Sequence, residues 1–273
     1  MPSITQMLQP FSAVVVTGGS SGLGKSFVEH IAKLQPQLWF CNLSRRVPDI
    51  NVSQLKLRHL PCDLEKSSEV ARGAAEVLEF LRRDAPTGRV LLLNNSGYGS
   101  YGSFPAPSLE HQLGMMDLNM RAVVHLTGLL LPELKARGGA IVNVASTAAF
   151  QPTTYMATYG ATKAFLLHWS LALNEELRHT NVRTLAVCPG PTATEFSKRA
   201  GLQFGAAPES ISMTCDEVVE ISLRALAKGR AMVVTGWKNK VMTALSARVP
   251  KPLAARGSAL VLAKYRLKQA GAA

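Results

Sequence analysis

The chain has 273 residues, of which 47% are apolar and 6% are aromatic, and its formal net charge is +12. An α/β chain of this length usually forms one domain around one large core. No apolar stretch approaches the roughly 18 residues that a membrane-spanning helix needs. Residues 1–12 also lack the basic region of a signal peptide. We therefore expect a cytoplasmic protein.

Predicted strands and helices alternate along the chain. Short apolar runs predict strands at residues 13–16, 38–43, 57–62, 90–93, 140–144, 182–187 and 232–234. Helical patterns lie between them, at residues 23–34, 67–83, 109–135, 155–178 and 216–227. This alternation predicts right-handed βαβ units and an α/β fold, a Rossmann-like doubly wound parallel sheet of about seven strands with helices on both faces.

A Gly-rich turn joins the first strand to the first helix. Residues 17–24 read Thr-Gly-Gly-Ser-Ser-Gly-Leu-Gly. Glycines let the backbone approach a pyrophosphate closely, and the helix N-terminus offers it free N–H groups. An ordinary flexible turn is the alternative, but the strand before and the helix after favour dinucleotide binding. The candidate residues are Gly18, Ser20, Ser21, Gly22, Leu23 and Gly24.

A series of short motifs follows this turn. They are Cys-Asp-Leu at 62–64, Asn-Asn-Ser-Gly at 94–97, Asn119, Ser146, Y-x-x-x-K at 159–163 and Pro-Gly at 189–190. In order and spacing, the set resembles the short-chain dehydrogenase/reductase family over about residues 12–235. The resemblance implies an NAD(P)-dependent oxidoreductase with the catalytic residues Asn119, Ser146, Tyr159 and Lys163. It extends the cofactor site to Asp63, Leu64, Asn95, Gly97, Tyr159, Lys163, Pro189, Gly190, Thr192 and Thr194.

The spacing of Tyr159 and Lys163 suits proton transfer. Four residues apart on a predicted helix, the two side chains share a face. A phenol with a pKa of about 10 is a poor base at neutral pH, and a nearby ammonium lowers that pKa. Tyr159 can then exchange a proton with a carbonyl or alcohol oxygen while hydride moves to or from nicotinamide. Ser146 can hydrogen-bond the same oxygen.

Two alternatives remain for these residues. The Tyr–Lys pair alone could be a surface contact, and the whole chain could be a dinucleotide-binding scaffold without catalysis. The family resemblance further implies that Lys163 binds the nicotinamide ribose and that Asn119 holds a water linking Lys163 to solvent. We also expect a homodimer or homotetramer.

The end of the second predicted strand indicates the cofactor. An NAD-preferring enzyme usually has an acid there, whereas this chain has Ser44, Arg45 and Arg46. Guanidinium groups suit a phosphate in charge and geometry, which favours NADP(H) over NAD(H). The alternative is two solvated arginines. Residues 46–55 look too short for the helix that the family often has at this point.

Aromatic residues indicate an apolar substrate. Tyr98, Phe150, Tyr155 and Phe196 are candidates to line the substrate pocket, and Leu202 and Phe204 continue the apolar stretch after Phe196. An apolar carbonyl or alcohol therefore fits better than a sugar phosphate. Steroid, fatty acyl, retinoid and xenobiotic carbonyl compounds all remain open. The alternative is that these residues only pack a lid onto the core.

The four cysteines and six histidines show no metal-binding spacing. Cys41, Cys62 and Cys188 lie in or beside predicted strands, so we expect buried, reduced thiols and a reducing compartment. We expect no metal site.

The C-terminal part carries most of the net charge. No acidic residue follows Glu220, whereas that segment contains Arg224, Lys228, Arg230, Lys238, Lys240, Arg248, Lys251, Arg256, Lys264, Arg266 and Lys268. We expect a catalytic domain at 1–236 and a basic, partly apolar extension at 237–273, which Pro250 and Pro252 divide into two helices. This extension could pack on the domain or bind an anionic membrane surface. Nucleic acid is a weaker alternative, because no stacking platform is evident.

Overall fold

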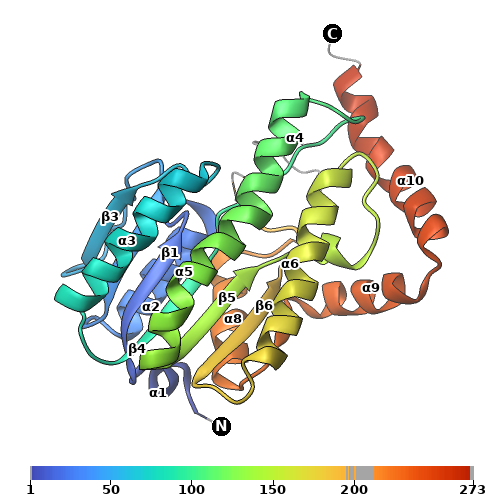
Figure 1. Cartoon of the computed structure of the whole chain (residues 1–273). Coiled ribbons are helices and arrows are strands. Elements are labelled where there is room, and N and C mark those ends of the chain that lie inside the picture. The colour runs from blue at the N-terminus through green and yellow to red at the C-terminus, as the bar shows by residue number, and fades with distance from the viewer. Residues whose placement is uncertain (1, 195, 197–199, 201–211, 271–273) are drawn as a thin grey trace.

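The computed structural model describes residues 2–194, 196, 200 and 212–270, with residues 264–270 described by their backbone alone. Seven strands form one parallel sheet (Figure 1), which confirms the predicted fold. They are β1 (Phe11–Thr17), β2 (Trp39–Ser44), β3 (Lys56–Pro61), β4 (Arg89–Asn94), β5 (Gly139–Val144), β6 (Val182–Cys188) and β7 (Met232–Val234). All of them except β3 contain a buried apolar run, as expected of strands covered on both faces, whereas β3 at the edge of the sheet buries only Leu60.

The strand order places one crevice at the centre of the sheet. The order is β3-β2-β1-β4-β5-β6-β7, so the chain moves outward from β1 in one direction and from β4 in the other. Ligands of such sheets bind where the order reverses, outside the carboxyl ends of the strands. The Gly-rich turn follows β1 at this edge, and the Asn-Asn-Ser-Gly motif begins at the end of β4.

Helices cover both faces of the sheet (Figure 1). On one face lie α3 (Ser67–Arg83), α5 (Ala122–Arg137) and α6 (Ala157–Glu176), which bury Phe80, Leu126 and Leu173 in one core cluster. The other face carries α1 (Ile4–Leu8), α2 (Gly22–Leu34) and α8 (Cys215–Ala227), whose cluster includes Phe27 and Leu223. The sheet thus separates two apolar layers.

Some elements differ from the sequence-based expectations. The stretch predicted as one helix consists of α4 (Leu109–Met116), the π-helical turn η1 (Asp117–Arg121) and α5. Helix α1 was not predicted; it begins with a capping box in which Ser3 and Gln6 satisfy each other's backbone N–H groups. Another expectation is confirmed: no helix lies between β2 and β3, where residues 46–55 looked too short for one.

The C-terminal extension forms α9 (Trp237–Arg248) and α10 (Lys251–Ala270), the two helices expected around Pro250. They lie beside α6 at one end of the molecule (Figure 1). Backbone N–H and Oγ1 of Thr154 hydrogen-bond Ser258 Oγ and the Ala255 carbonyl of α10, at 3.0 and 2.9 Å. Lys251 Nζ donates to the Phe150 carbonyl at 3.1 Å. The extension is therefore attached to the loop that precedes α6.

Candidate active site

One large cavity borders the carboxyl ends of the strands. Its volume is about 1490 Å³, whereas a pocket for one small ligand usually holds roughly 300–1,000 Å³. It extends from the Gly-rich turn past Ser146 and Tyr159 to α9 and α10. Every predicted cofactor-binding residue borders it except Gly24. The cavity has room for two ligands side by side.

The Gly-rich turn fits a pyrophosphate. Helix α2 begins at Gly22 beside the cavity, with Ser20, Ser21 and Leu23 also in the lining, so its free N–H groups lie where an anion can reach them. Gly18 has a φ of +69°, which favours glycine. A Cβ on Gly24 would lie 2.3 Å from the Gly18 carbonyl oxygen, so this position also excludes a side chain.

Two side chains from the sequence motifs, Thr17 and Asn95, hold this turn together with Asn42, which no motif indicated. Thr17 Oγ1 accepts from the backbone N–H groups of Asn95 and Ser96, both at 3.0 Å. Asn95 Nδ2 donates to the Thr17 carbonyl at 3.0 Å, and Asn42 Oδ1 accepts from Gly19 N–H at 2.7 Å. Asn42 lies inside β2, where a polar residue in an apolar run was the only available signal. The turn is thus braced from both neighbouring strands.

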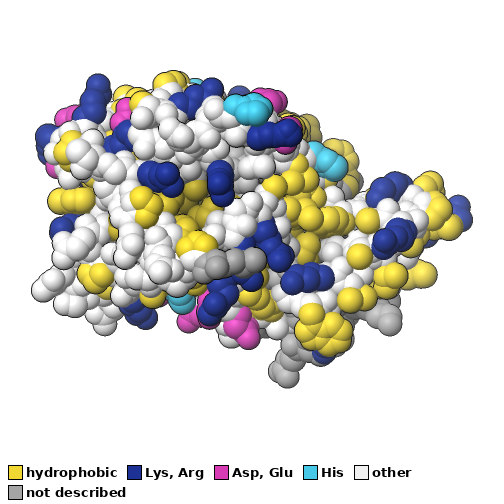
Figure 2. Space-filling model, turned by 90° about the horizontal axis from the view of Figure 1, so that it is seen from below, with side chains coloured by type: hydrophobic (Ala, Val, Ile, Leu, Met, Phe, Trp, Pro, Cys, Tyr) yellow, Lys and Arg dark blue, Asp and Glu magenta, His cyan; other side chains and the backbone are white. Residues whose placement is uncertain are grey.

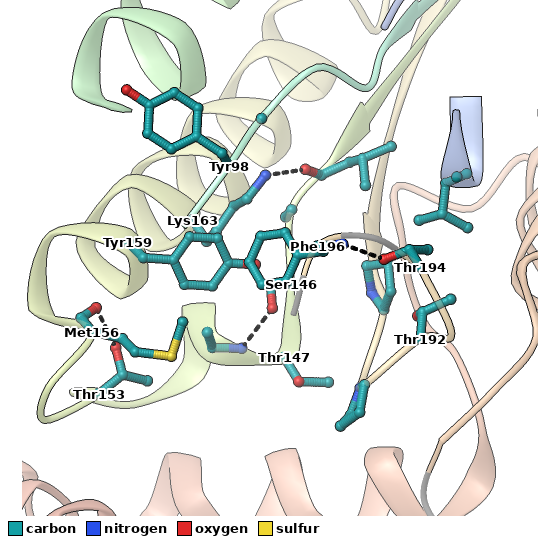
Figure 3. A pocket seen from close by; sticks show the side chains of 18 of the residues that line it. Tyr98, Ser146, Thr147, Thr153, Met156, Tyr159, Lys163, Thr192, Thr194 and Phe196 are labelled. Atoms are coloured by element: carbon teal, nitrogen blue, oxygen red, sulfur yellow. Dashed lines mark hydrogen bonds between the residues drawn. The ribbon is translucent and has the colours of Figure 1, made fainter. Parts of the chain in front are cut away.

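Tyr159, Ser146 and Phe196 gather around one part of the cavity (Figure 3). Tyr159 and Lys163 come from α6, and the rings of Tyr159 and Phe196 are 5.2 Å apart. Lys163 Nζ donates to the Val144 carbonyl at 2.8 Å and lies 5.9 Å from the Tyr159 ring centroid. Ser146 Oγ accepts from Ala148 N–H at 3.1 Å. An oxygen atom bound here would meet two hydroxyl groups.

Burial changes both pKa values of the Tyr–Lys pair. It raises the pKa of Tyr159 from an ordinary 10.0 to about 12, although a hydrogen bond with Ser146 opposes the shift. It lowers the pKa of Lys163 from 10.5 to about 8, with the Cys188 thiol group opposing. From the sequence we expected Lys163 to lower the pKa of Tyr159. The shift runs the other way, because loss of water around the buried phenol outweighs the hydrogen bond with Ser146.

Asn119 lies behind the cavity lining, in the π turn η1. Its Nδ2 donates to the Tyr98 carbonyl at 2.9 Å and to Thr162 Oγ1 at 3.0 Å, and its Oδ1 accepts from Tyr98 N–H at 3.2 Å. A Cβ on Gly97 would meet both Asn119 Oδ1 and Lys163 Nζ, at 2.9 and 3.3 Å. The two catalytic candidates thus approach the same point, and glycine leaves the space between them open.

The two arginines after β2 differ in their surroundings. Arg46 Nη2 donates to Ser21 Oγ at 3.0 Å, which places its guanidinium beside the Gly-rich turn. Arg45 Nη1 lies 3.7 Å from Glu65 Oε1. Burial raises the pKa of the Glu65 carboxyl, and Arg45 opposes that shift. Both arginines border the cavity.

The predicted substrate residues divide into two groups. Tyr98 and Phe196 line the cavity, whereas Phe150 and Tyr155 lie outside its lining. Leu202 and Phe204 are outside the described residues. The extension supplies a further wall that was not predicted, which consists of Met242, Thr243, Ser246, Val249, Leu253, Ala254, Gly257, Ser258, Val261 and Leu262. No motif marks these residues, because they carry no chemistry of their own.

Comparison with known proteins decides the family. A family model described as short chain dehydrogenase matches residues 12–204. The chain belongs to the short-chain dehydrogenase/reductase family. Serine 3-dehydrogenase of Rhizobium radiobacter is 38% identical to it over 191 residues, which cover 67% of this chain and 73% of that enzyme.

Solved structures of family members agree with the fold. A short-chain dehydrogenase from Sphingobium yanoikuyae in complex with NADPH is 28% identical, with a TM-score of 0.72 over 88% of this chain and 96% of that chain. A short chain dehydrogenase/reductase from Burkholderia phymatum in complex with NAD is 20% identical, with a TM-score of 0.74 over 86% of this chain and 92% of that chain. As a short-chain dehydrogenase/reductase, this chain is an oxidoreductase that acts on CH–OH groups of a small molecule with NAD(P).

Proposed function

We propose that this chain interconverts an apolar ketone or aldehyde and its alcohol with NADP(H), and that Tyr159 is the general acid/base. One observation carries the proposal: Tyr159, with a pKa of about 12, holds its proton at neutral pH inside a cavity that also contains Ser146 and Phe196. A buried phenol that keeps its proton is a proton donor.

The residues divide the reaction between them. When bound, the reduced nicotinamide supplies hydride to the carbonyl carbon. Tyr159 donates its hydroxyl proton to the carbonyl oxygen, and Ser146 hydrogen-bonds that oxygen and orients it. Lys163, held by the Val144 carbonyl, offsets the charge left on the phenolate. Asn119 fixes the backbone at Tyr98 and borders the space through which a water can reach Lys163.

The variant Tyr159→Phe tests this role. It removes the transferable proton and keeps the ring against Phe196. We expect turnover of an accepted ketone with NADPH to fall by about 10²–10⁴, while NADPH affinity from fluorescence titration stays near that of the parent. Tyr155→Phe is the matched control, because Tyr155 lies outside the cavity lining. Equal losses in both variants would contradict the assignment. NADPH binding with no turnover by the parent on a broad ketone panel would favour the silent scaffold instead.

The preference for NADP(H) is supported by Arg46. Its guanidinium lies beside Ser21 of the Gly-rich turn, where it can bind an adenosine 2′-phosphate bidentately. Loss of a charge-assisted contact corresponds to roughly a tenfold change in affinity. Arg46→Ala should therefore lower the affinity for NADPH about tenfold and leave the affinity for NADH unchanged. Arg45→Ala is the control, and we expect a smaller effect because Arg45 pairs with Glu65. Equal weakening of both cofactors by Arg46→Ala would contradict the preference.

We further propose a homodimer or homotetramer formed through α5 and α6. These helices lie on the same face of the sheet (Figure 1) and expose Val124, Leu129 and Phe165. A second copy that covers them would remove apolar surface from water. Sedimentation equilibrium of the parent and of Leu129→Ser/Phe165→Ser tests this, and we expect the variant to dissociate at concentrations where the parent is associated. A monomeric parent would contradict it.

We also propose a cytoplasmic location with part of the protein on an anionic membrane surface. Cys41, Cys62 and Cys188 are buried free thiols, and burial raises their pKa values to about 12, 11 and 12. Unpaired thiols are typical of a reducing compartment. Cell fractionation before and after a high-salt wash tests the location. Recovery only in an oxidising compartment would contradict it.

A further inference from the structure

Helix α9 buries two uncharged polar side chains and exposes several large apolar ones. Asn239 and Thr243, which face the domain, are only 1% and 5% exposed. Trp237 and Leu245 are 71% and 61% exposed, and Val241 lies between them on the same stripe, because the three are four residues apart. An ordinary surface helix has the opposite arrangement. The outer stripe of α9 therefore suits an apolar environment.

Helix α10 repeats this arrangement. Ser258 is buried, and its hydroxyl bonds to Thr154 of the domain. Leu253, which also borders the cavity, and Leu260 are 54% and 74% exposed. Arg256 lies on the same stripe, three residues after Leu253 and four before Leu260. Two successive helices thus present apolar side chains to the outside.

Basic side chains accompany this apolar surface. Lys238, Lys240, Arg248 and Arg256 are all exposed, and no acidic residue follows Glu220 in the sequence. Figure 2 shows Lys and Arg side chains among hydrophobic ones over the part at the right, where Figure 1 has α9 and α10. A surface of this composition is complementary to a partner that is both apolar and anionic.

The same helices border the cavity. Met242, Val249, Leu253 and Val261 line the cavity and are also exposed at the surface. They connect the outer apolar face with the space beside Tyr159 and Phe196 without an intervening charged side chain among them. An apolar molecule can therefore pass from that face to the catalytic residues along apolar contacts.

We propose that α9 and α10 dock on an anionic lipid bilayer and that the cavity takes a long-chain aliphatic ketone or alcohol directly from that bilayer. The second half rests on the proposed function. Charge argues for lipid over a second copy of the chain, because two copies meeting through this face would bring Lys240 and Arg248 of each against those of the other. Among the described residues, no helix is long and apolar enough to cross a membrane, so the helix pair lies on the bilayer surface.

Vesicle flotation of the full-length protein tests the docking. We expect binding to vesicles of phosphatidylglycerol and phosphatidylcholine, about tenfold or more weaker binding to phosphatidylcholine alone, and loss of binding at high salt. Lys240→Gln/Arg248→Gln should weaken binding to the anionic vesicles about tenfold or more. Arg82→Gln/Arg83→Gln removes the same charge from exposed positions on α3, at the other end of the molecule, and should leave binding unchanged.

The apolar stripe is tested by Val241→Ser/Leu245→Ser. Both side chains are exposed and outside the cavity lining, so the variant should fold and melt like the parent. We expect its affinity for anionic vesicles to fall about tenfold or more. Binding that ignores lipid charge, or that survives both double variants, would overturn the docking. A parent dimer that Val241→Ser/Leu245→Ser converts to monomer, with no vesicle binding, would show that a second copy covers the face and would also overturn it.

Two ketones separate the substrate route from the enzyme activity itself. Methyl butyl ketone is supplied in solution, and methyl pentadecyl ketone is supplied within anionic vesicles, each with NADPH. We expect Val241→Ser/Leu245→Ser to reduce the soluble ketone like the parent and the embedded ketone about tenfold more slowly. Equal rates of parent and variant on the embedded ketone would overturn the route and leave the enzyme function intact. Vesicle binding without reduction of either ketone by the parent would contradict the proposed function and leave the docking intact.

Discussion

Strand β4 and helix α9 place their side chains in opposite ways. In β4, the run from Val90 to Leu93 is completely buried between the two helical layers. In α9, the buried residues are Asn239 and Thr243, and the large apolar side chains face outward. The sheet thus gains stability from its own apolar residues. The apolar residues of α9 contribute little to folding and remain available to a partner.

Matched Leu→Ala substitutions in β4 and α9 should show this contrast most clearly, as a difference in the free energy of unfolding. Leu93→Ala removes a fully buried side chain and should lower the free energy of unfolding by about 2–5 kcal/mol. Leu245→Ala should change it by no more than about 0.5 kcal/mol, because that side chain is already exposed. Urea unfolding measures both. A loss of similar size in Leu245→Ala would mean that protein covers the outer face of α9 in solution, and the contrast would fail.

A substitution in the Gly-rich turn should have the next largest effect, on the affinity for NADPH. A Cβ on Gly24 would meet the Gly18 carbonyl oxygen, which belongs to the backbone and cannot rotate away. Gly24→Ala should therefore distort the turn and lower the affinity for NADPH about tenfold or more. A tenfold loss corresponds to about 1.4 kcal/mol of binding free energy. Gly128→Ala in α5 is the control, since a Cβ there meets nothing within 4 Å. Fluorescence titration gives both affinities, and unchanged binding by Gly24→Ala would show that the turn adapts.

Lys163 should make the free energy of unfolding depend on pH in a way that an exposed lysine does not. Burial lowers its pKa from 10.5 to about 8, so between those values the unfolded chain holds a proton that the folded protein has released. The free energy of unfolding must then rise with pH in this window, by up to about 1.4 kcal/mol per pH unit. In Lys163→Met this rise should be absent. Tyr159, with a raised pKa, lowers stability only above about pH 10 and is present in both proteins. Urea unfolding of both at pH 8 to 10 measures the difference; parallel pH profiles would contradict it.

The smallest expected effect is a change in the local stability of α10. Gly257 lies within this helix, and a Cβ there meets nothing within 4 Å. Gly257→Ala should stabilise α10 locally by about 0.5–1 kcal/mol, because glycine has more conformational freedom to lose. Amide hydrogen exchange within α10 should slow accordingly, with exchange in β4 unchanged. Faster exchange in α10 would show that the glycine accommodates a contact.

The alternation of strands and helices was predictable because buried parallel strands need continuous apolar runs. The catalytic and Gly-rich motifs were predictable because their chemistry needs particular residue types at fixed spacing, and the sequence alone indicates Ser146, Tyr159 and Lys163. The contacts that support them were not predictable: Asn42, which lies outside the motifs, and Thr17, which begins the Gly-rich motif, brace the turn through hydrogen bonds between neighbouring strands. Such contacts exist only once the sheet has formed.

The sequence by itself therefore determined the fold class, the family and the candidate catalytic residues. The tertiary structure decided the rest. It raised the pKa of Tyr159, because desolvation depends on how much protein surrounds the phenol. It also made α9 and α10 a wall of the cavity with Leu245 outside and Asn239 inside. Their mixed sequence is compatible with either side facing the domain, and only packing against Gly190 and Thr154 selects one.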